Sequence, residues 1–221
     1  MSLAEELVRT LSRTGREGWC VADHMSELYV ALARDKSVDR EVAVMFDPAQ
    51  LELIMDSGRG GTLERTVERL KQVMTDTTPL VFFPLNYDAH WSLLVYHRHY
   101  NTWYACDSIW TPAKPGAPSQ SMHHDFVRQV LTRMTQLGVP LPEGGTQMFI
   151  EDLPRQADEW ECGRFTLGYM AVFMSPTGRR LWHDRALYEQ WLKEHLAAVN
   201  MGTLPLFTVY LKELALRYRR S

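Results

Sequence analysis

The sequence predicts an α+β fold in which helices flank a mixed β-sheet. Three apolar runs that follow one another closely, residues 79–85, 90–96 and 102–106, have the length and composition of buried strands. Stretches with apolar residues at helical spacing lie on either side of them. With 221 residues, 45% of them hydrophobic, the chain suits a single domain over residues 1–221 with a complete core.

The helices are predicted from apolar spacing and from signals at their ends. Leu3, Leu7 and Leu11 indicate a short amphipathic helix, which the glycine-containing segment 14–18 ends. Asp47 followed by Pro48 is typical of a helix start. The predicted helices, in chain order, are residues 3–13, 22–34, 48–55, 63–74, 127–137, one that follows Cys162 and ends near Phe173, one around 188–195, and one over 207–218.

The remaining segments are predicted as short strands, turns and loops. Residues 41–46 and 147–150 are short and apolar, so we expect two further strands there. Polar turns over residues 86–89 and 97–101 join the three central strands. Residues 110–120 are rich in proline and small residues and predict a loop, and residues 175–178 predict a turn.

Composition and charge exclude several classes of protein. The net charge is −3, whereas a nucleic-acid-binding protein is expected to be basic. No apolar run approaches the roughly 20 residues of a membrane span, and the N-terminus lacks the pattern of a secretory signal. The three cysteines are an odd and sparse set, which favours a reducing compartment, the cytoplasm or nucleus, over a disulfide framework. We therefore expect neither a nucleic-acid partner nor a membrane partner.

Two histidine pairs raise the question of a metal site. His97 and His99 bracket a turn, and His123 and His124 open a helix. Neither pair has a second cluster of ligands at the spacing that zinc sites use. We therefore expect no metal and no other cofactor.

Cys162 lies where a polar segment, residues 156–161, meets an apolar run of helical length. Backbone N–H groups and the positive end of the helix dipole favour a thiolate at such a position. A cysteine at a loop–helix junction can equally be a small buried apolar residue. The position of this cysteine alone leaves both interpretations open.

His90 and Asp107 are the clearest candidates to accompany a nucleophilic cysteine, which needs a base and a group that orients the base. His90 begins one predicted strand and Asp107 follows the next. An antiparallel pair of strands brings these two ends side by side. The separation, 107 − 90 = 17 residues, suits two ordinary strands and a short loop. The pattern predicts an imidazole beside a carboxylate at one edge of the sheet, although a buried structural histidine and a turn aspartate would fit the same positions.

Four features occur in an order that resembles a known enzyme family. They are His90-Trp91-Ser-Leu-Leu-Val-Tyr96, then Asp107-Ser108, then Gln156, then Cys162-Gly163. The order is similar to that of the ubiquitin-like-protein proteases, the group of SUMO proteases and deneddylases with adenoviral and bacterial effector relatives. The resemblance runs from Trp19 to Phe173, and the close run at His90 and the compact length resemble the deneddylase branch more than the large SUMO proteases. It implies a papain-like cysteine protease fold in permuted order, with the histidine before the cysteine.

The resemblance implies four catalytic roles. Cys162 would be the nucleophile, His90 the general base and acid, and Asp107 the group that orients the imidazole. Gln156 would donate a side-chain N–H to the oxyanion hole, together with the backbone N–H of Cys162.

The resemblance also implies contacts with a substrate tail. Trp91 would cover the site and help form a narrow channel. Trp19 and Asp23 would match a Trp-Leu-x-Asp pattern of the family, with one extra residue between them. Trp160 is expected to pack beside the site, and Glu161 stands where the family usually has aspartate.

The resemblance predicts a cysteine protease or isopeptidase that cleaves after the C-terminal Gly-Gly of a ubiquitin-like modifier. The expected partners are a ubiquitin-like protein (the deneddylase substrate, SUMO or ubiquitin) and its conjugates, with the enzyme as a monomer. A secreted effector would act in a host cytosol.

Two other functions stay open. One is an effector-type acetyltransferase with the same triad, which the close match at residues 90–96 and the lack of a basic cluster for coenzyme A disfavour. The other is a non-catalytic binder of a ubiquitin-like protein. The presence of all four residue types that catalysis needs, at His90, Asp107, Gln156 and Cys162, disfavours this function.

Overall fold

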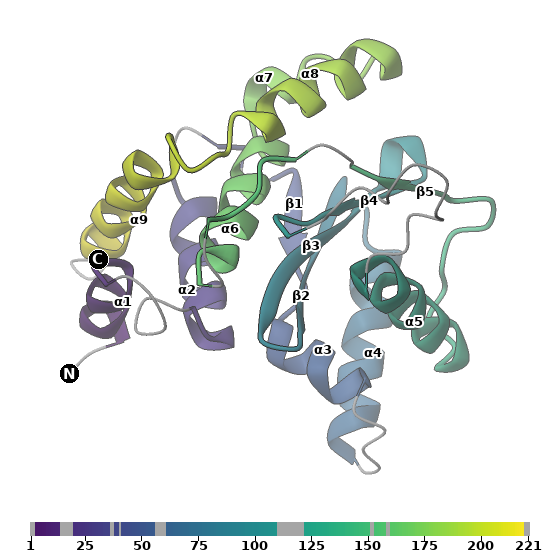
Figure 1. The fold of residues 1–221 in the computed structure, drawn as a ribbon. Helices are drawn as coiled ribbons and strands as arrows, with labels where there is room; N and C mark the ends of the chain where they lie inside the picture. The colour runs from purple at the N-terminus through teal and green to yellow at the C-terminus, as the bar shows by residue number, and fades with distance from the viewer. Residues whose placement is uncertain are drawn as a thin grey trace.

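The structure is a computed structural model that describes residues 3–13, 20–35, 38–39, 41–55, 61–109, 122–150, 153–157 and 160–218. Its elements, in chain order, are α1 (Leu3–Leu11), α2 (Ala22–Ala33), β1 (Ala43–Met45), α3 (Pro48–Met55), α4 (Gly61–Thr75), β2 (Leu80–Tyr87), β3 (His90–His97), a 3₁₀ turn (Arg98–Tyr100), β4 (Thr102–Cys106), α5 (Met122–Gln136), β5 (Thr146–Phe149), α6 (Cys162–Phe173), α7 (Pro176–Arg179), α8 (Arg185–Ala197) and α9 (Leu204–Tyr218), as Figure 1 shows. The predicted helix break at 14–18, the predicted loop at 110–120 and Trp19 lie outside the described residues.

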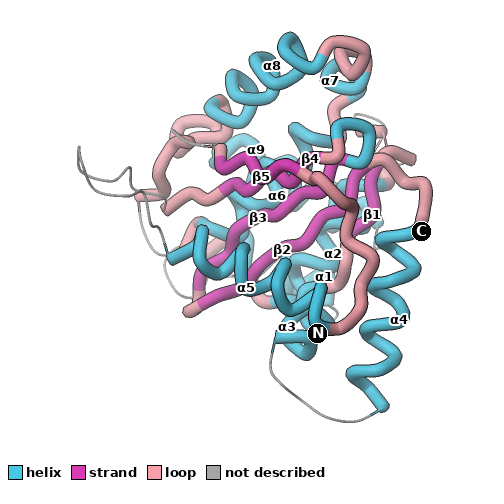
Figure 2. The backbone as a smooth tube through the Cα atoms, turned by 90° about the vertical axis from the view of Figure 1, so that its right-hand side faces the viewer, coloured by secondary structure: helices cyan, strands magenta, loops and turns pink. Residues whose placement is uncertain are grey.

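The described strands form one five-stranded sheet in the order β1-β2-β3-β4-β5 (Figure 2). β1 runs parallel to β2, the pairs β2–β3 and β3–β4 are antiparallel, and β5 runs parallel to β4. The three central strands are the three apolar runs of the sequence. The prediction of an α+β fold around a mixed sheet is therefore confirmed.

Helices cover both faces of the sheet, so the molecule has three layers (Figure 1). Alternate side chains of β2 enter different cores: Leu80 and Phe82 pack with residues of α1, α2, α6, α8 and α9. Val81 and Phe83 pack with residues of α3, α4 and α5 on the other face. Because both faces are buried, the central strands are largely apolar and show no regular polar alternation.

Most predicted elements are present with shifted ends. Asp47 caps α3 as expected, since its Oδ1 accepts the N–H groups of Ala49 at 2.9 Å and Gln50 at 3.3 Å. The predicted turn at 175–178 is wrong: this segment contains α7, which Pro176 begins with a backbone angle already suited to a helix. Helix α5 starts at Met122, which confirms the prediction that His123 and His124 open a helix.

A two-residue turn joins β2 to β3 and places His90. Asp88 and Ala89 both have positive φ, 51° and 59°, the combination that a type I′ hairpin turn requires. Tyr87 pairs with His90 directly across the hairpin. The turn therefore sets His90 as the first residue of β3.

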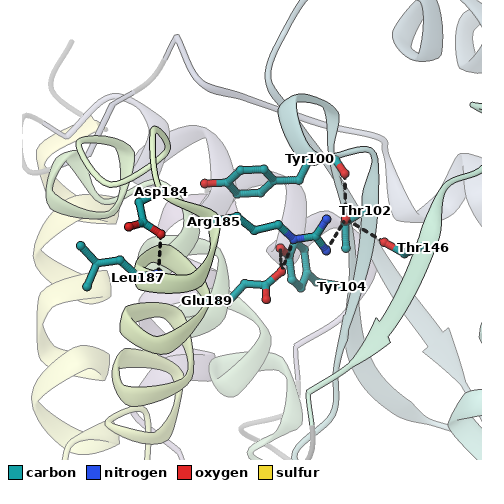
Figure 3. Close-up of polar contacts among 8 residues, drawn as sticks. All are labelled: Tyr100, Thr102, Tyr104, Thr146, Asp184, Arg185, Leu187 and Glu189. Carbon is teal, nitrogen blue, oxygen red and sulfur yellow. Dashed lines mark hydrogen bonds and ion pairs between the residues drawn. The ribbon is translucent and has the colours of Figure 1, made fainter.

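Helix α8 is tied to the start of β4 by the polar network in Figure 3. Arg185 donates from Nε to Glu189 at 2.7 Å and from Nη2 to the hydroxyl of Thr102 at 3.2 Å. Its guanidinium also lies over the ring of Tyr100, 5.6 Å from the centroid. These contacts hold the start of the strand whose other end leads into Asp107.

Among the described helices, none combines the length and the apolar composition that crossing a bilayer requires.

Candidate active site

The ends of β3 and β4 bring His90 and Asp107 together. In the antiparallel register, Leu93 pairs with Cys106, so Asp107 follows the last paired residue of β4 and lies near the start of β3. His90 Nε2 is 2.6 Å from Asp107 Oδ1, and the same carboxylate oxygen accepts the N–H of Ile109 at 3.0 Å. The Asp107 side chain is 6% exposed and that of His90 18%. The predicted pairing of imidazole and carboxylate at this edge is confirmed.

Cys162 is the first residue of α6 and is completely buried. The helix starts at once, because the carbonyl of Glu161 accepts the N–H groups of Arg164 at 2.9 Å and Phe165 at 3.1 Å. The earliest N–H groups of a helix have no partner within it and form the positive end of its dipole. The predicted position of this thiol at a helix N-terminus is confirmed.

Gly163 allows the start of α6 to approach the rest of the site closely. A Cβ atom at this position would lie 2.9 Å from Cβ of Cys20 and 3.5 Å from Cδ1 of Trp91. Trp91 Nε1 in turn donates a 2.6 Å hydrogen bond to the carbonyl oxygen of Cys20. The chain at Cys20, strand β3 and helix α6 are therefore packed together at the catalytic candidate, and only glycine fits the contact.

The electrostatics of His90 favour its protonated form. Burial lowers its pKa, but the hydrogen bond with Asp107, the proximity of Cys162 and the negative charges of both groups raise it to about 9 overall. Nε2 is engaged by Asp107, so Nδ1 is the ring nitrogen that remains for Cys162. An imidazole held by a buried carboxylate in this way can accept and hold a proton, as the base of a nucleophilic cysteine must.

The other two cysteines are poorly suited to act as nucleophiles. Cys20 and Cys106 are buried, and burial raises the pKa of Cys20 to about 12 and raises that of Cys106 as well. Neither therefore supplies a thiolate at neutral pH. The interpretation of Cys106 as a core residue is confirmed.

Gln156 is held by Ser108, the residue after Asp107. The main-chain N–H of Gln156 donates to the carbonyl of Ser108 at 3.1 Å, and the Ser108 hydroxyl lies 2.6 Å from Gln156 Oε1. Among the described residues, the buried Nε2 of Gln156 meets no hydrogen-bond acceptor. The side-chain amide thus has N–H groups to donate, as an oxyanion donor requires. Sequence reasoning gave Ser108 no role, although its place in the Asp107-Ser108 motif was a signal.

Glu161 and Arg164 form a second feature that sequence reasoning missed. Arg164 Nη1 lies 2.8 Å and 2.9 Å from the two carboxylate oxygens of Glu161, and its Nη2 donates to the carbonyl of Arg13 at 2.9 Å. Both side chains are mostly buried. This pair ties the start of α6 to the chain that follows α1. Its sequence signal is an acid and a base three residues apart on a helix.

The predicted substrate-facing residues lie in different surroundings. Trp91 is 0% exposed, Trp160 is half-buried and precedes Glu161, and Asp23 is exposed in the first turn of α2. Trp19 is outside the described residues. Contacts of these residues with a substrate stay predictions.

A metal centre has no candidate ligands in the part of the chain that the structure describes, where no three histidine, cysteine or acidic residues are grouped for one.

Comparison with known proteins identifies the family. A family model described as the Ulp1 protease family, C-terminal catalytic domain, matches residues 23–183, well over half of the chain. A search of curated proteins finds no match.

Solved structures share the fold. The Xanthomonas campestris effector protein XopD bound to ubiquitin is similar with a TM-score of 0.54 and 20% identity, over 81% of this chain and 90% of that one. The SUMO protease Ulp1 with its catalytic cysteine oxidised to a sulfenic acid is similar with a TM-score of 0.54 and 17% identity, over 89% of this chain and 83% of that one. A structure described as the de-sumoylating protease has a TM-score of 0.57 and 12% identity, over 97% of this chain and 86% of that one. These likenesses confirm the predicted papain-like fold. The chain belongs to the Ulp1 protease family and is a cysteine peptidase that acts on ubiquitin-like proteins.

Proposed function

We propose that this peptidase cleaves the bond after the C-terminal Gly-Gly of a ubiquitin-like modifier, with Cys162 as nucleophile, His90 as base and acid, and Asp107 as the orienting group. The observation that carries the proposal is the imidazole of His90. One of its nitrogens is 2.6 Å from a buried carboxylate, and against the effect of burial that carboxylate and the nearby Cys162 raise its pKa to about 9.

The first half of the reaction forms a thioester. His90 takes the proton of Cys162, and the thiolate attacks the carbonyl carbon of the last glycine. The carbonyl electrons move to oxygen and return when the C–N bond breaks. The leaving amine, a lysine side chain or a peptide nitrogen, receives the proton from His90.

The second half of the reaction releases the modifier. His90 removes a proton from water, which attacks the thioester carbon. The C–S bond breaks and the thiolate of Cys162 is restored, with the proton back on His90. Asp107 keeps the imidazole oriented throughout, because its bond to Nε2 leaves Nδ1 toward the sulfur.

Gln156 and the backbone N–H of Cys162 would stabilise the oxyanion in both halves. The support for Gln156 is its buried Nε2, which meets no acceptor among the described residues. An oxyanion forming within reach of this amide would give it a partner in the transition state. Loss of such a donor typically lowers kcat by about 10²–10³.

Burial of the nucleophile supports a glycine tail. The thiol of Cys162 and the indole of Trp91 are both 0% exposed. A substrate tail that approaches so enclosed a thiol meets the least steric hindrance where its residues have no side chains. A folded modifier that ends in Gly-Gly meets this requirement.

The relatives support an order in which candidate modifiers should be tested. Ulp1 and the de-sumoylating protease are SUMO proteases and XopD was solved with ubiquitin, which makes SUMO the first modifier to test and ubiquitin the second. The run at His90 resembles deneddylases, so their modifier is the third. We expect a monomer that acts on precursors or conjugates in a reducing compartment, the cytoplasm or nucleus.

The test is covalent trapping. The protein is incubated with SUMO, ubiquitin and the deneddylase modifier, each carrying a C-terminal electrophile, and intact mass reports adducts. We expect one adduct on the wild-type protein, mapped to Cys162 and absent from Cys162→Ala. Gln156→Ala, with an unchanged melting temperature, should process the same modifier about 10²–10³ times more slowly.

Two outcomes would contradict the proposal. An adduct that still forms with Cys162→Ala would show that another residue is the nucleophile. A folded protein that forms no adduct with any of the three modifiers would exclude this substrate class and favour acetyl transfer through the same cysteine.

A further inference from the structure

We propose that Ser108 is a positioning residue that keeps the side-chain amide of Gln156 turned with its N–H groups toward the oxyanion. This inference rests on the proposed role of Gln156 as an oxyanion donor. The residues that follow β4 would then orient two groups: Asp107 orients the imidazole of His90, and Ser108 orients the amide of Gln156.

Two hydrogen bonds join Ser108 to Gln156. The Ser108 carbonyl accepts the main-chain N–H of Gln156 at 3.1 Å, and the Ser108 hydroxyl donates to Gln156 Oε1 at 2.6 Å. Ser108 is 1% exposed, so water does not compete for its hydroxyl. The bonds connect residues 48 positions apart and hold both the backbone and the side chain of Gln156.

The orientation of the amide matters because its oxygen and nitrogen exchange places when the group rotates by half a turn. In the observed orientation the oxygen is satisfied by the serine hydroxyl and Nε2 is buried without an acceptor among the described residues. In the reverse orientation a carbonyl oxygen would occupy the place of Nε2. A carbonyl there would repel a developing oxyanion instead of stabilising it.

The end of β4 therefore sets two groups through adjacent residues. Asp107 holds His90 through the 2.6 Å contact with Nε2, and Ser108 holds Gln156. The backbone that carries both is fixed in turn, because Asp107 Oδ1 accepts the N–H of Ile109 at 3.0 Å. The adjacent residues Asp107 and Ser108 thus set the base and the oxyanion donor relative to each other.

The experiment is a double-mutant cycle on modifier hydrolysis with Ser108→Ala, Gln156→Ala and the double variant. We expect Ser108→Ala to lower kcat about tenfold at nearly unchanged KM, the loss of one neutral hydrogen bond. The double variant should match Gln156→Ala, because Ser108 acts only through that amide. Ser108→Thr keeps the hydroxyl and should restore most of kcat.

A second readout separates Gln156 from the triad. Alkylation of Cys162 by iodoacetamide needs the thiolate but no oxyanion donor. We expect its rate and pH profile to be unchanged in Ser108→Ala, with Asp107→Asn as the control that alters them. If Ser108→Ala fails to fold, Ser108→Cys, which keeps the size and weakens the donor, takes its place in the kinetic cycle.

Several results would overturn the inference. Losses in kcat that multiply in the double variant would show that Ser108 acts independently of Gln156. A changed alkylation profile in Ser108→Ala would show that it acts through Asp107 and His90. By contrast, wild-type kcat in Gln156→Ala would remove the oxyanion role itself, which is a failure of the proposed function and is visible before Ser108 is changed.

Discussion

Replacement of Asp107 by asparagine tests the electrostatic core of the site. The carboxylate lies 2.6 Å from His90 Nε2 and is 6% exposed, so little water screens the pair. Asparagine keeps the size of the side chain and removes the charge. The imidazolium should then lose its main stabilising partner while the backbone stays in place.

The magnitude follows from the causes of the His90 pKa. Burial alone lowers it, and the hydrogen bonds and charges of Asp107 and Cys162 raise it to about 9 from the ordinary 6.5. This rise corresponds to a preference for the imidazolium of about 3 kcal/mol. Without Asp107, only Cys162 remains to raise the pKa of His90 against the lowering effect of burial, so we expect this pKa to fall by about two units or more. We expect kcat/KM to be lower by roughly 10³ or more.

The assay is an NMR pH titration of the histidine Cε1–H signals. The chain has 8 histidines, and the signal that is lost in His90→Gln identifies His90. Its midpoint should lie near 9 in the wild type and near or below 6.5 in Asp107→Asn. Cys162→Ala removes the other raising group and should give an intermediate midpoint.

Stability should follow the same titration. Because the folded pKa of His90 is above the unfolded value of 6.5, its contribution is complete below pH 6.5 and is lost as the pH rises to about 9. The wild type should lose up to about 3 kcal/mol of unfolding free energy over this window, and Asp107→Asn clearly less. A midpoint within one unit of 9 in the variant would refute the assignment of the raised pKa to Asp107.

Three further predictions concern packing, the hairpin and acid stability. Gly163→Ala should cost about 1–3 kcal/mol in thermal denaturation, because its Cβ would lie 2.9 Å from that of Cys20; Gly61→Ala, with open space around it, is the control and an equal loss there would contradict the reasoning. Ala89→Gly should raise the unfolding free energy by roughly 0.5–1 kcal/mol in urea titrations, because alanine is held at φ 59°; an unchanged or lower value would show that the turn carries no strain. Burial, followed by neighbouring positive charge, lowers the pKa of His97 to about 3, so stability should fall between pH 6.5 and 3; His97→Phe should flatten that part of the pH profile, and an identical profile would exclude His97 as the source.

Much of the fold and part of the site could be predicted from the sequence because the signals are local. The three central strands are short apolar runs bounded by turn residues, and their order in the sheet follows from tight connections. His90 and Asp107 belong to neighbouring strands and are 17 residues apart, so the hairpin alone brings them together. Cys162 stands at the change from polar loop to apolar helix, which locates it at a helix start.

Other features depended on contacts between distant parts of the chain. The short helix α7 at Pro176 packs against α8, a contact that apolar spacing does not record. The need for glycine at 163 comes from Cys20, which belongs to a segment before the whole sheet. No local pattern in the sequence indicates such an approach.

The sequence by itself determined the residue types of the site and the pairing of His90 with Asp107. These follow from the spacing of apolar residues, the residues that form turns and the lengths of the strands, each of which depends on only a few neighbouring residues. The tertiary structure decided the rest. Ser108 reaches Gln156 across 48 residues, and Arg164 reaches the carbonyl of Arg13 across 151. Such contacts form only when separate elements pack against one another, since the geometry of each bond is set by the relative placement of two backbones and not by either segment alone.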